Sequence, residues 1–130
     1  MKTQVVTNSL GRGIICTAFG KGRTHDFRVF KESKTRINPD ILAMADTGFT
    51  GIAKFHANSL VPLKNSKKRP LSAEDKLFNR TVARLRVYNE NAISSVKIFK
   101  ILSERYRNRR RRFALRFNLI AAFFNRSIGF

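Results

Sequence analysis

The stretch "ILAMADTGFTGI", residues 41–52, is an apolar run that ends in an acid and leads into a loop with two glycines. A short apolar run bounded by turn residues is typical of a buried strand. The pattern therefore predicts that Asp46 lies at a strand end facing a loop, where α/β sheets commonly carry functional side chains. Alternatively, the Asp46 carboxylate only bonds nearby backbone amides in the turn. The stretch by itself leaves both interpretations open.

Acids are scarce in the rest of the chain. Its 130 residues, enough for one small domain, include 27 Lys and Arg but only 8 Asp and Glu, which gives a net charge of +19. The resulting field attracts polyanions, with nucleic acid the first candidate and anionic membrane surfaces the second. No apolar run reaches the roughly 18 residues of a membrane-spanning helix, and the N-terminus lacks the apolar core of a signal peptide. We therefore expect a cytoplasmic, nucleoid-associated protein without a membrane partner.

The segments before residue 41 predict a hairpin and a short helix. "TQVVTN" and "IICTAFG" have the composition of two strands, and the turn between them contains glycine. Asp26 is then predicted to cap a short helix that places Phe27 and Phe30 on one side.

Cysteine and histidine offer little metal chemistry. Cys16 is the single cysteine, and its place in an apolar run predicts a buried, inert thiol. The two histidines, His25 and His56, lack zinc-like spacing, so a metal site in this chain would depend on oxygen ligands.

The segment after the loop is a basic linker followed by a long helix. "VPLKNSKKRPLS", residues 61–72, contains four cations: Lys64, Lys67, Lys68 and Arg69. Ser72 and Asp75 have the spacing of a capping box and predict the start of the helix. Its apolar stripe is expected to consist of Phe78, Val82, Leu85, Ala92, Val96 and Phe99, with Asn89 counted in the series.

A second helix is predicted from about residue 109 to residue 124, with Phe113, Phe117, Ile120 and Phe124 along one stripe. Between Lys97 and Arg126 there are ten positive residues and one acid, a local balance of +9. The expected DNA-contacting residues here are Arg107, Arg109, Arg110, Arg111 and Arg112, in addition to the four cations of the linker.

Glu90 is the second acid of interest. On a helix it lies four residues from Arg86, so an ordinary surface ion pair worth a few tenths of a kcal/mol is one interpretation. Together with Asp46, however, it resembles the pairing of a strand-end acid and a helix acid by which nucleases hold two divalent ions about 3.5 to 4 Å apart. Carboxylate oxygens suit Mg²⁺ or Mn²⁺. Two acids are usually one too few for such a site.

Several segments together carry a family resemblance. "GKGRTHDFRVFKES", "ADTGFTGI", "HANSLVPLK", "LSAEDKLFNRTVARLRVYNENAISSVKIFKIL", "ERYRNRRRRF" and "LRFNLIAAFFN" closely resemble the C-terminal catalytic region of bacterial insertion-sequence transposases with a DDE, ribonuclease H-like domain. The resemblance covers almost the whole chain. It maps the family's second acid onto Asp46 and its third onto Glu90, as catalytic and metal-binding residues with Mg²⁺ or Mn²⁺ as cofactor.

The resemblance also implies a fold and partners. The expected fold is α/β, a ribonuclease H-like mixed sheet with flanking helices, truncated at the N-terminus because no residue matches the first acid and its strand. Residues 1–130 are thus expected to be the C-terminal part of the catalytic domain, inactive alone. The implied partners are transposon-end and target DNA, an upstream transposase polypeptide as a candidate, and further copies in an oligomeric transposition complex.

Four more residues lie on segments that resemble the family: His25, Asp26, His56 and Asn58. For Asp26 the helix cap is the favoured interpretation, and a place beside the metal site is the other. His56 and Asn58 are expected near the metal or substrate without ligating the metal. The alternative function for the chain is a non-catalytic, basic nucleic-acid-binding protein, for which converging Asp46 and Glu90 carboxylates would have no use.

Overall fold

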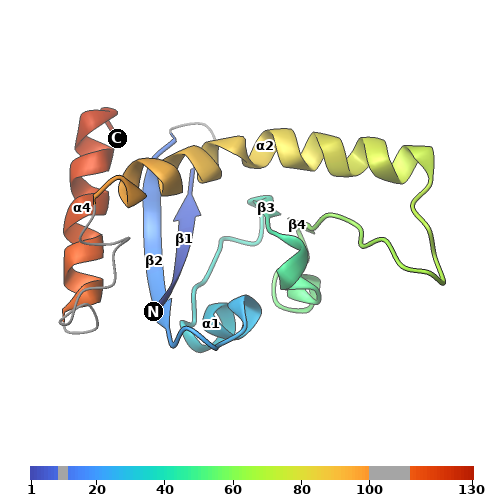
Figure 1. The fold of residues 1–130 in the computed structure, drawn as a ribbon, viewed down its shortest axis with the longest axis horizontal. Helices are drawn as coiled ribbons and strands as arrows, with labels where there is room; N and C mark the ends of the chain where they lie inside the picture. Colours follow the sequence, from blue (N-terminus) through green and yellow to red (C-terminus); the bar gives the residue numbers. More distant parts are fainter. Residues whose placement is uncertain (9–11, 100–111) are drawn as a thin grey trace. The chain divides into compact units, whose positions relative to one another are not determined.

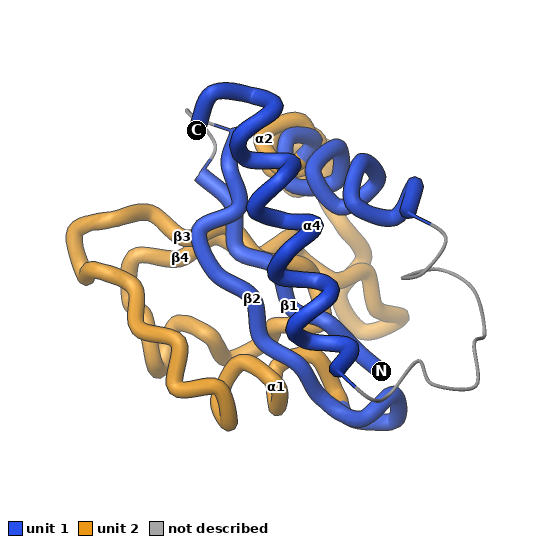
Figure 2. The backbone as a smooth tube through the Cα atoms, turned by 90° about the vertical axis from the view of Figure 1, so that its left-hand side faces the viewer, with its two compact units in different colours: residues 1–24, 87–130 blue, residues 25–86 orange. Residues whose placement is uncertain are grey.

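The computed structural model describes residues 1–8, 12–99 and 112–130, and the chain divides into two compact units (Figure 2). Unit 1 comprises residues 1–24 and 87–130, and unit 2 comprises residues 25–86. Helices and strands occur in both, which confirms the expected α/β class. The described strands form two separate two-stranded sheets, one antiparallel and one parallel, instead of the single mixed sheet that was expected.

Unit 1 contains the predicted hairpin. Strands β1 (Lys2–Thr7) and β2 (Ile14–Gly20) pair antiparallel, and the register shifts between Val6 and Thr7 (Figure 1). The β-branched residues of both segments favour this extended pairing. Helix α4 (Phe113–Ser127) packs against β2.

The core of unit 1 lies between β2, α4 and the last turns of α2 (Ala73–Lys97). Phe19 contacts the rings of Phe113 and Phe117 edge-on, with centroids 6.0 and 5.7 Å apart. The predicted stripe of α4 is buried at Phe113, Phe117 and Ile120 and half-buried at Phe124. The structure gives α4 from Phe113, with Arg112 in a left-handed conformation (φ 56°) as its N-cap, and residues 109–111 of the predicted helix lie outside the described residues.

The side-chain amide of Asn125 links helix α4 to the first residue of β2 within unit 1. Asn125, near the end of α4, accepts a hydrogen bond from the backbone N–H of Ile14 and donates one to the Ile14 carbonyl, both at 2.8 Å. Ile14 is buried and lies where the β1–β2 register shifts, so Asn125 supplies hydrogen-bond partners to backbone groups that are shielded from water.

Unit 2 begins with helix α1 (Asp26–Glu32), and here one expectation was wrong. The N-cap is His25, whose Nδ1 accepts from the backbone N–H of Phe27 at 3.3 Å, and Asp26 is the first helical residue. Its negative charge still suits the positive end of the helix dipole. Val29 and Phe30 are the buried residues of α1.

The strand expected at residues 41–46 is short and not buried. Strand β3 (Ala43–Met44) pairs parallel with β4 (Ser59–Leu60), and the preceding Ile41 and Leu42 are 56% and 46% exposed. Two 3₁₀ turns, η1 (Thr47–Phe49) and η2 (Ile52–Lys54), connect the strands. Gly51 between the turns has φ 97°, which only glycine adopts without strain.

The long helix α2 starts as predicted. The backbone N–H of Ser72 donates to Oδ2 of Asp75, and the N–H of Asp75 donates to Oγ of Ser72, both at 3.1 Å, so the capping box is confirmed. The expected stripe is only partly confirmed: Val82, Ala92 and Val96 are each 1% exposed. Phe78 and Leu85 are exposed instead, and Phe99 lies beyond the end of the helix. None of the helices in the described part of the chain is long and apolar enough to cross a membrane.

Candidate functional site

Asp46 lies two residues after the end of β3, at the strand end as predicted, and is the N-cap of η1. Its Oδ1 accepts hydrogen bonds from the backbone N–H of Thr47 at 2.6 Å and from Thr47 Oγ1 at 3.3 Å. The backbone-binding interpretation of this acid is therefore correct. It does not exclude a chemical role, because Oδ2 takes part in neither bond and the side chain is 59% exposed.

The neighbour of Asp46 from another element is Arg86 on α2. Nη1 of Arg86 lies 3.5 Å from Oδ1 of Asp46, and the Arg86 side chain is only 19% exposed. Such a pair, open to water on the carboxylate side, contributes at most about 1 kcal/mol to stability. Sequence patterns did not predict it, because the two residues are forty positions apart.

Glu90 is exposed and follows Arg86 by four residues on α2. At this spacing two helical residues lie on the same side of the helix, one turn apart. Asp46 belongs to unit 2 and Glu90 to unit 1, so the convergence of the two carboxylates stays a prediction.

The oxygen chemistry of Asp46 fits a divalent ion. Exposed carboxylate oxygens are hard ligands of the kind that Mg²⁺ and Mn²⁺ prefer. The bond from Thr47 holds Oδ1 in place and leaves Oδ2 directed elsewhere. Arg86 is a competing cation, so an ion would have to bind beside it or displace it. Within residues 1–8, 12–99 and 112–130, no three or more His, Cys, Asp or Glu side chains cluster as a metal site.

His56 and Asn58 form hydrogen bonds to the backbone of the segment that precedes β3 and Asp46. His56 is buried at 6% exposure, and its Nε2 donates to the carbonyl of Ile41 at 2.7 Å. The side-chain Nδ2 of Asn58 donates to the backbone carbonyl of Asp40 at 3.2 Å. The backbone carbonyl of Asn58 accepts a hydrogen bond from the N–H of Ala43 at 3.0 Å. These bonds hold the approach to β3 against the segment that enters β4. These hydrogen bonds were not predicted from the sequence. A location of His56 and Asn58 near the metal or the substrate stays a prediction.

Helix α1 packs against the turn that follows Asp46. A Cβ added at Gly48 would lie 3.8 Å from Oδ2 of Asp26, so the Asp26 carboxylate reaches the turn itself. The ring of Phe27 lies 3.6 Å from the corresponding position at Gly51 and contacts the Phe49 ring edge-on. A Cβ at either glycine would make an ordinary van der Waals contact with α1, so the turn requires glycine at Gly51 for its backbone conformation (φ 97°) and not for close packing.

The predicted DNA-contacting cations divide into two groups. Lys64, Lys67, Lys68 and Arg69 are all exposed, on a segment that Asn79 of α2 holds through two hydrogen bonds to the backbone of Leu63. Arg112 is exposed at the start of α4. The other four arginines, Arg107, Arg109, Arg110 and Arg111, lie outside the described residues.

Cys16 offers no activated nucleophile. The residue is half-buried on β2, and burial raises the pKa of its thiol above the ordinary value. A raised pKa lowers the fraction of reactive thiolate at neutral pH. The expectation of an inert thiol is therefore supported, although the side chain is less buried than expected.

Comparison with known proteins adds independent findings. Residues 1–125 match the family described as DDE superfamily endonuclease. Over 125 residues the chain is 46% identical to the "Probable transposase for insertion sequence element IS702" of Microchaete diplosiphon. The aligned region is 96% of this chain and 45% of that relative, so the chain spans less than half the relative's length. No solved structure matches the chain.

Proposed function

Since this chain belongs to the DDE superfamily endonuclease family, we propose that it acts in DNA transposition as part of an insertion-sequence transposase. Two findings support the proposal: the family match extends over residues 1–125, and a relative with 46% identity carries the name of a probable transposase. The ribonuclease H-like arrangement of the strands belongs to the same proposal. It agrees with the parallel β3–β4 pair that ends in an acid.

Asp46 and Glu90 are the proposed catalytic and metal-binding carboxylates. The observation that carries this assignment is the Asp46 carboxylate, exposed at the end of β3 and 3.5 Å from Arg86, whose helix presents Glu90 one turn later. A residue of α2 thus already reaches Asp46, and the helical spacing puts Glu90 on the same side of α2 as that residue.

The bound metal ions, Mg²⁺ or Mn²⁺, would supply charge stabilisation on the attacking and leaving oxygens of the cleaved phosphodiester. The chain's own residues supply the rest. Thr47 fixes the Asp46 carboxylate through its backbone N–H, which limits the rotation of that side chain. Arg86 provides a positive charge beside the carboxylate, where the phosphate of a DNA strand would also be attracted. Asp26, His25, His56 and Asn58 support the turn and are proposed to lie around the site without ligating the metal.

DNA is the proposed partner, as transposon ends and as target. The linker cations, Arg112 and the other arginines between residues 107 and 111 would contact phosphates, which fix position without reading sequence. Oligomeric assembly in the DNA complex is part of the same proposal.

Iron-directed cleavage of the protein backbone tests the shared metal site without requiring enzyme activity. Fe²⁺ bound in place of Mg²⁺ reduces added hydrogen peroxide to hydroxide and a hydroxyl radical that cuts the chain near the ion, and added ascorbate reduces the resulting Fe³⁺ back to Fe²⁺. We expect cuts near both Asp46 and Glu90, which disappear in Asp46→Asn and in Glu90→Gln. Asp40→Asn and Glu74→Gln are the matched controls, because both are exposed acids: Asp40 lies six residues before Asp46, on the other side of β3, and Glu74 lies on the same helix as Glu90. Cuts at one acid only, or cuts that survive both substitutions, would contradict the assignment.

A nicking assay with the 130-residue polypeptide complements the iron experiment. The resemblance matches only Asp46 and Glu90 to acids of the family, and two-metal cleavage requires both ions to be held beside the attacking and leaving oxygens. We therefore expect no nicking of plasmid DNA with Mg²⁺ or Mn²⁺. Nicking that Glu90→Gln abolishes would show that another acid completes the site. DNA binding without iron-directed cuts would favour the alternative, a non-catalytic basic nucleic-acid-binding protein.

A further inference from the structure

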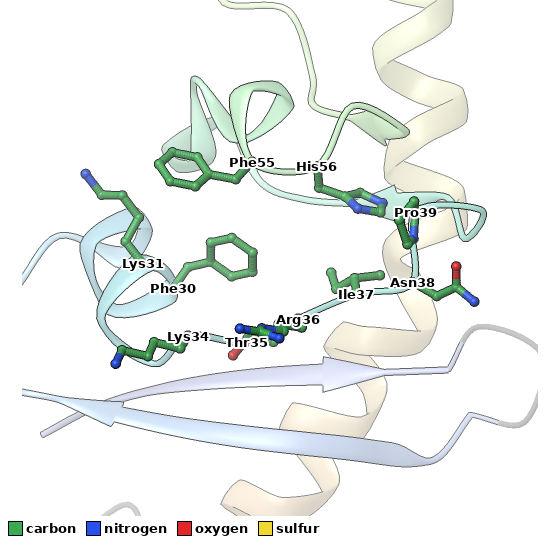
Figure 3. A pocket seen from close by; sticks show the side chains of 10 residues that line it. All are labelled: Phe30, Lys31, Lys34, Thr35, Arg36, Ile37, Asn38, Pro39, Phe55 and His56. Atoms are coloured by element: carbon green, nitrogen blue, oxygen red, sulfur yellow. The ribbon is translucent and has the colours of Figure 1, made fainter.

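Unit 2 contains an open pocket of about 650 Å³ between α1 and the segment after η2 (Figure 3). Its walls come from the end of α1, from residues 34–39 and from Phe55 and His56. This volume lies within the roughly 300 to 1,000 Å³ of ligand-sized sites. Asp46 and Arg86 do not line it, so the pocket is separate from the proposed catalytic residues.

Aromatic rings form one side of the pocket. The Phe55 ring is 62% exposed although it is large and apolar, whereas Phe30 is 8% exposed. Both rings are held by Phe27: Phe55 meets it edge-on with centroids 5.7 Å apart, and Phe30 stacks on it at 6.3 Å. An exposed ring whose orientation is set by a packed neighbour offers a flat surface at little entropic cost.

Cations surround this aromatic side. Three of the ten lining residues are Lys31, Lys34 and Arg36, all exposed, and none of the ten is acidic. In Figure 3 the ammonium groups of Lys31 and Lys34 extend outward at the rim, whereas the Phe30 ring and Ile37 face the hollow. Lys34 also has φ 52°, a left-handed conformation that glycine or asparagine adopts more easily. The lysine thus presents a charge at a position where a smaller residue would be less strained.

We propose that this pocket takes the base of an unpaired nucleotide of DNA, with the Phe55 ring against the base and Lys34 and Arg36 near the flanking phosphates. A ligand that is planar and apolar at one end and anionic at the other matches the lining. In a duplex the faces of the bases are already stacked, so only an unpaired or extruded base can present its face to a ring. The inference rests on the proposed function, because strand cleavage and transfer leave unpaired nucleotides.

Fluorescence anisotropy with the full chain tests the pocket. The probes are a labelled single-stranded oligothymidine and a duplex hairpin of equal charge, with thymidine monophosphate as a competitor. Phe55→Leu keeps an apolar side chain against Phe27 and removes the ring, and Leu77→Ala, at a residue 63% exposed on α2, is its control. Lys34→Gln with Arg36→Gln removes the rim charges, and Lys76→Gln with Arg80→Gln removes two exposed charges elsewhere in unit 2. Circular dichroism melting verifies that every variant folds.

The expected result is a loss of single-strand affinity of about 5-fold or more in Phe55→Leu and in the rim variant, with both controls near the unmodified protein. Duplex affinity should change equally little in Phe55→Leu and Leu77→Ala. Equal single-strand affinity in Phe55→Leu and Leu77→Ala would overturn the proposal. The proposal would also be overturned if the chain bound thymidine monophosphate but did not bind the single-stranded oligothymidine. Duplex binding by the unmodified chain is scored separately, because its failure would count against the proposed function and not against the pocket.

Discussion

Arg86 Nη1 lies 3.5 Å from Asp46 Oδ1, and the same oxygen accepts the backbone N–H of Thr47 at 2.6 Å. One oxygen of the proposed catalytic acid is thus engaged on two sides, by a loop amide and by a helix cation. The second oxygen takes part in neither interaction. This arrangement makes Arg86 both a positioning group for the carboxylate and a competitor for any metal ion that binds there.

Removing that competitor should strengthen metal binding. Arg86→Gln is expected to raise the apparent affinity for Mn²⁺ by up to about 5-fold, because an exposed ion pair is worth at most about 1 kcal/mol. Titration followed by electron paramagnetic resonance measures free Mn²⁺ directly. The control is Arg84→Gln, an exposed position two residues away that faces another side of α2. An unchanged affinity in Arg86→Gln would mean that the ion and Arg86 do not compete for the Asp46 carboxylate.

The His56 bond should matter for stability. His56→Ala leaves the Ile41 carbonyl without its donor and opens a cavity where the buried imidazole was, so we expect a loss of about 1–3 kcal/mol in the free energy of unfolding. His56→Gln retains a donor and should lose less. Urea denaturation followed by circular dichroism measures both. Equal losses in the two variants would show that packing, and not the hydrogen bond, dominates.

The two hydrogen bonds of Asn125 should stabilise unit 1. Asn125→Ala removes the partners of both the N–H and the carbonyl of buried Ile14, and the expected destabilisation is about 1–3 kcal/mol. The control is Asn118→Ala on the same helix, whose hydrogen bond to Thr17 is exposed and should cost under about 1 kcal/mol. Urea midpoints that rank the two variants in the reverse order would contradict this prediction.

The capping box should stabilise the start of α2. Ser72→Ala removes the hydroxyl that accepts from the Asp75 N–H, at an expected cost of about 0.5–2 kcal/mol, and Ser72→Gly should cost only a few tenths. Thermal melting of the helical signal measures the difference. Ser94→Ala, on an exposed helical position, serves as the control and should be neutral or slightly stabilising. An unchanged melting temperature in Ser72→Ala would show that packing, and not the capping box, stabilises this helix.

DNA binding should depend on the arginine run. Changing Arg109, Arg110, Arg111 and Arg112 to alanine should flatten the dependence of log affinity on log salt by about 0.9 for each phosphate that the chain no longer neutralises. The comparison variant changes Lys64, Lys67, Lys68 and Arg69 in the same way and shows whether both groups bind. Affinities for two unrelated duplexes should fall in parallel, since phosphate contacts read no sequence. An unchanged slope would assign the arginines to solubility or to partner contacts.

Local features of the chain were read correctly from the sequence because they depend on residues close together. The hairpin follows from two β-rich segments around a glycine turn, and the start of α2 from Ser72 and Asp75, three residues apart. The position of Asp46 after a strand follows from the same kind of local pattern. The high positive charge and the inert Cys16 likewise required no knowledge of the fold, whereas the match of Asp46 and Glu90 to the acids of the family stays a prediction.

Other features depended on which distant segments folding brings together. Asn125 bonds to Ile14 across 111 positions, Arg86 pairs with Asp46 across forty and His56 reaches Ile41 across fifteen. No periodicity or capping rule acts over such separations. For the same reason the apolar run at Ile41 and Leu42 gave a false expectation of burial: hydrophobicity favours burial, but only a neighbouring segment can cover a side chain, and here the sheet is two residues long.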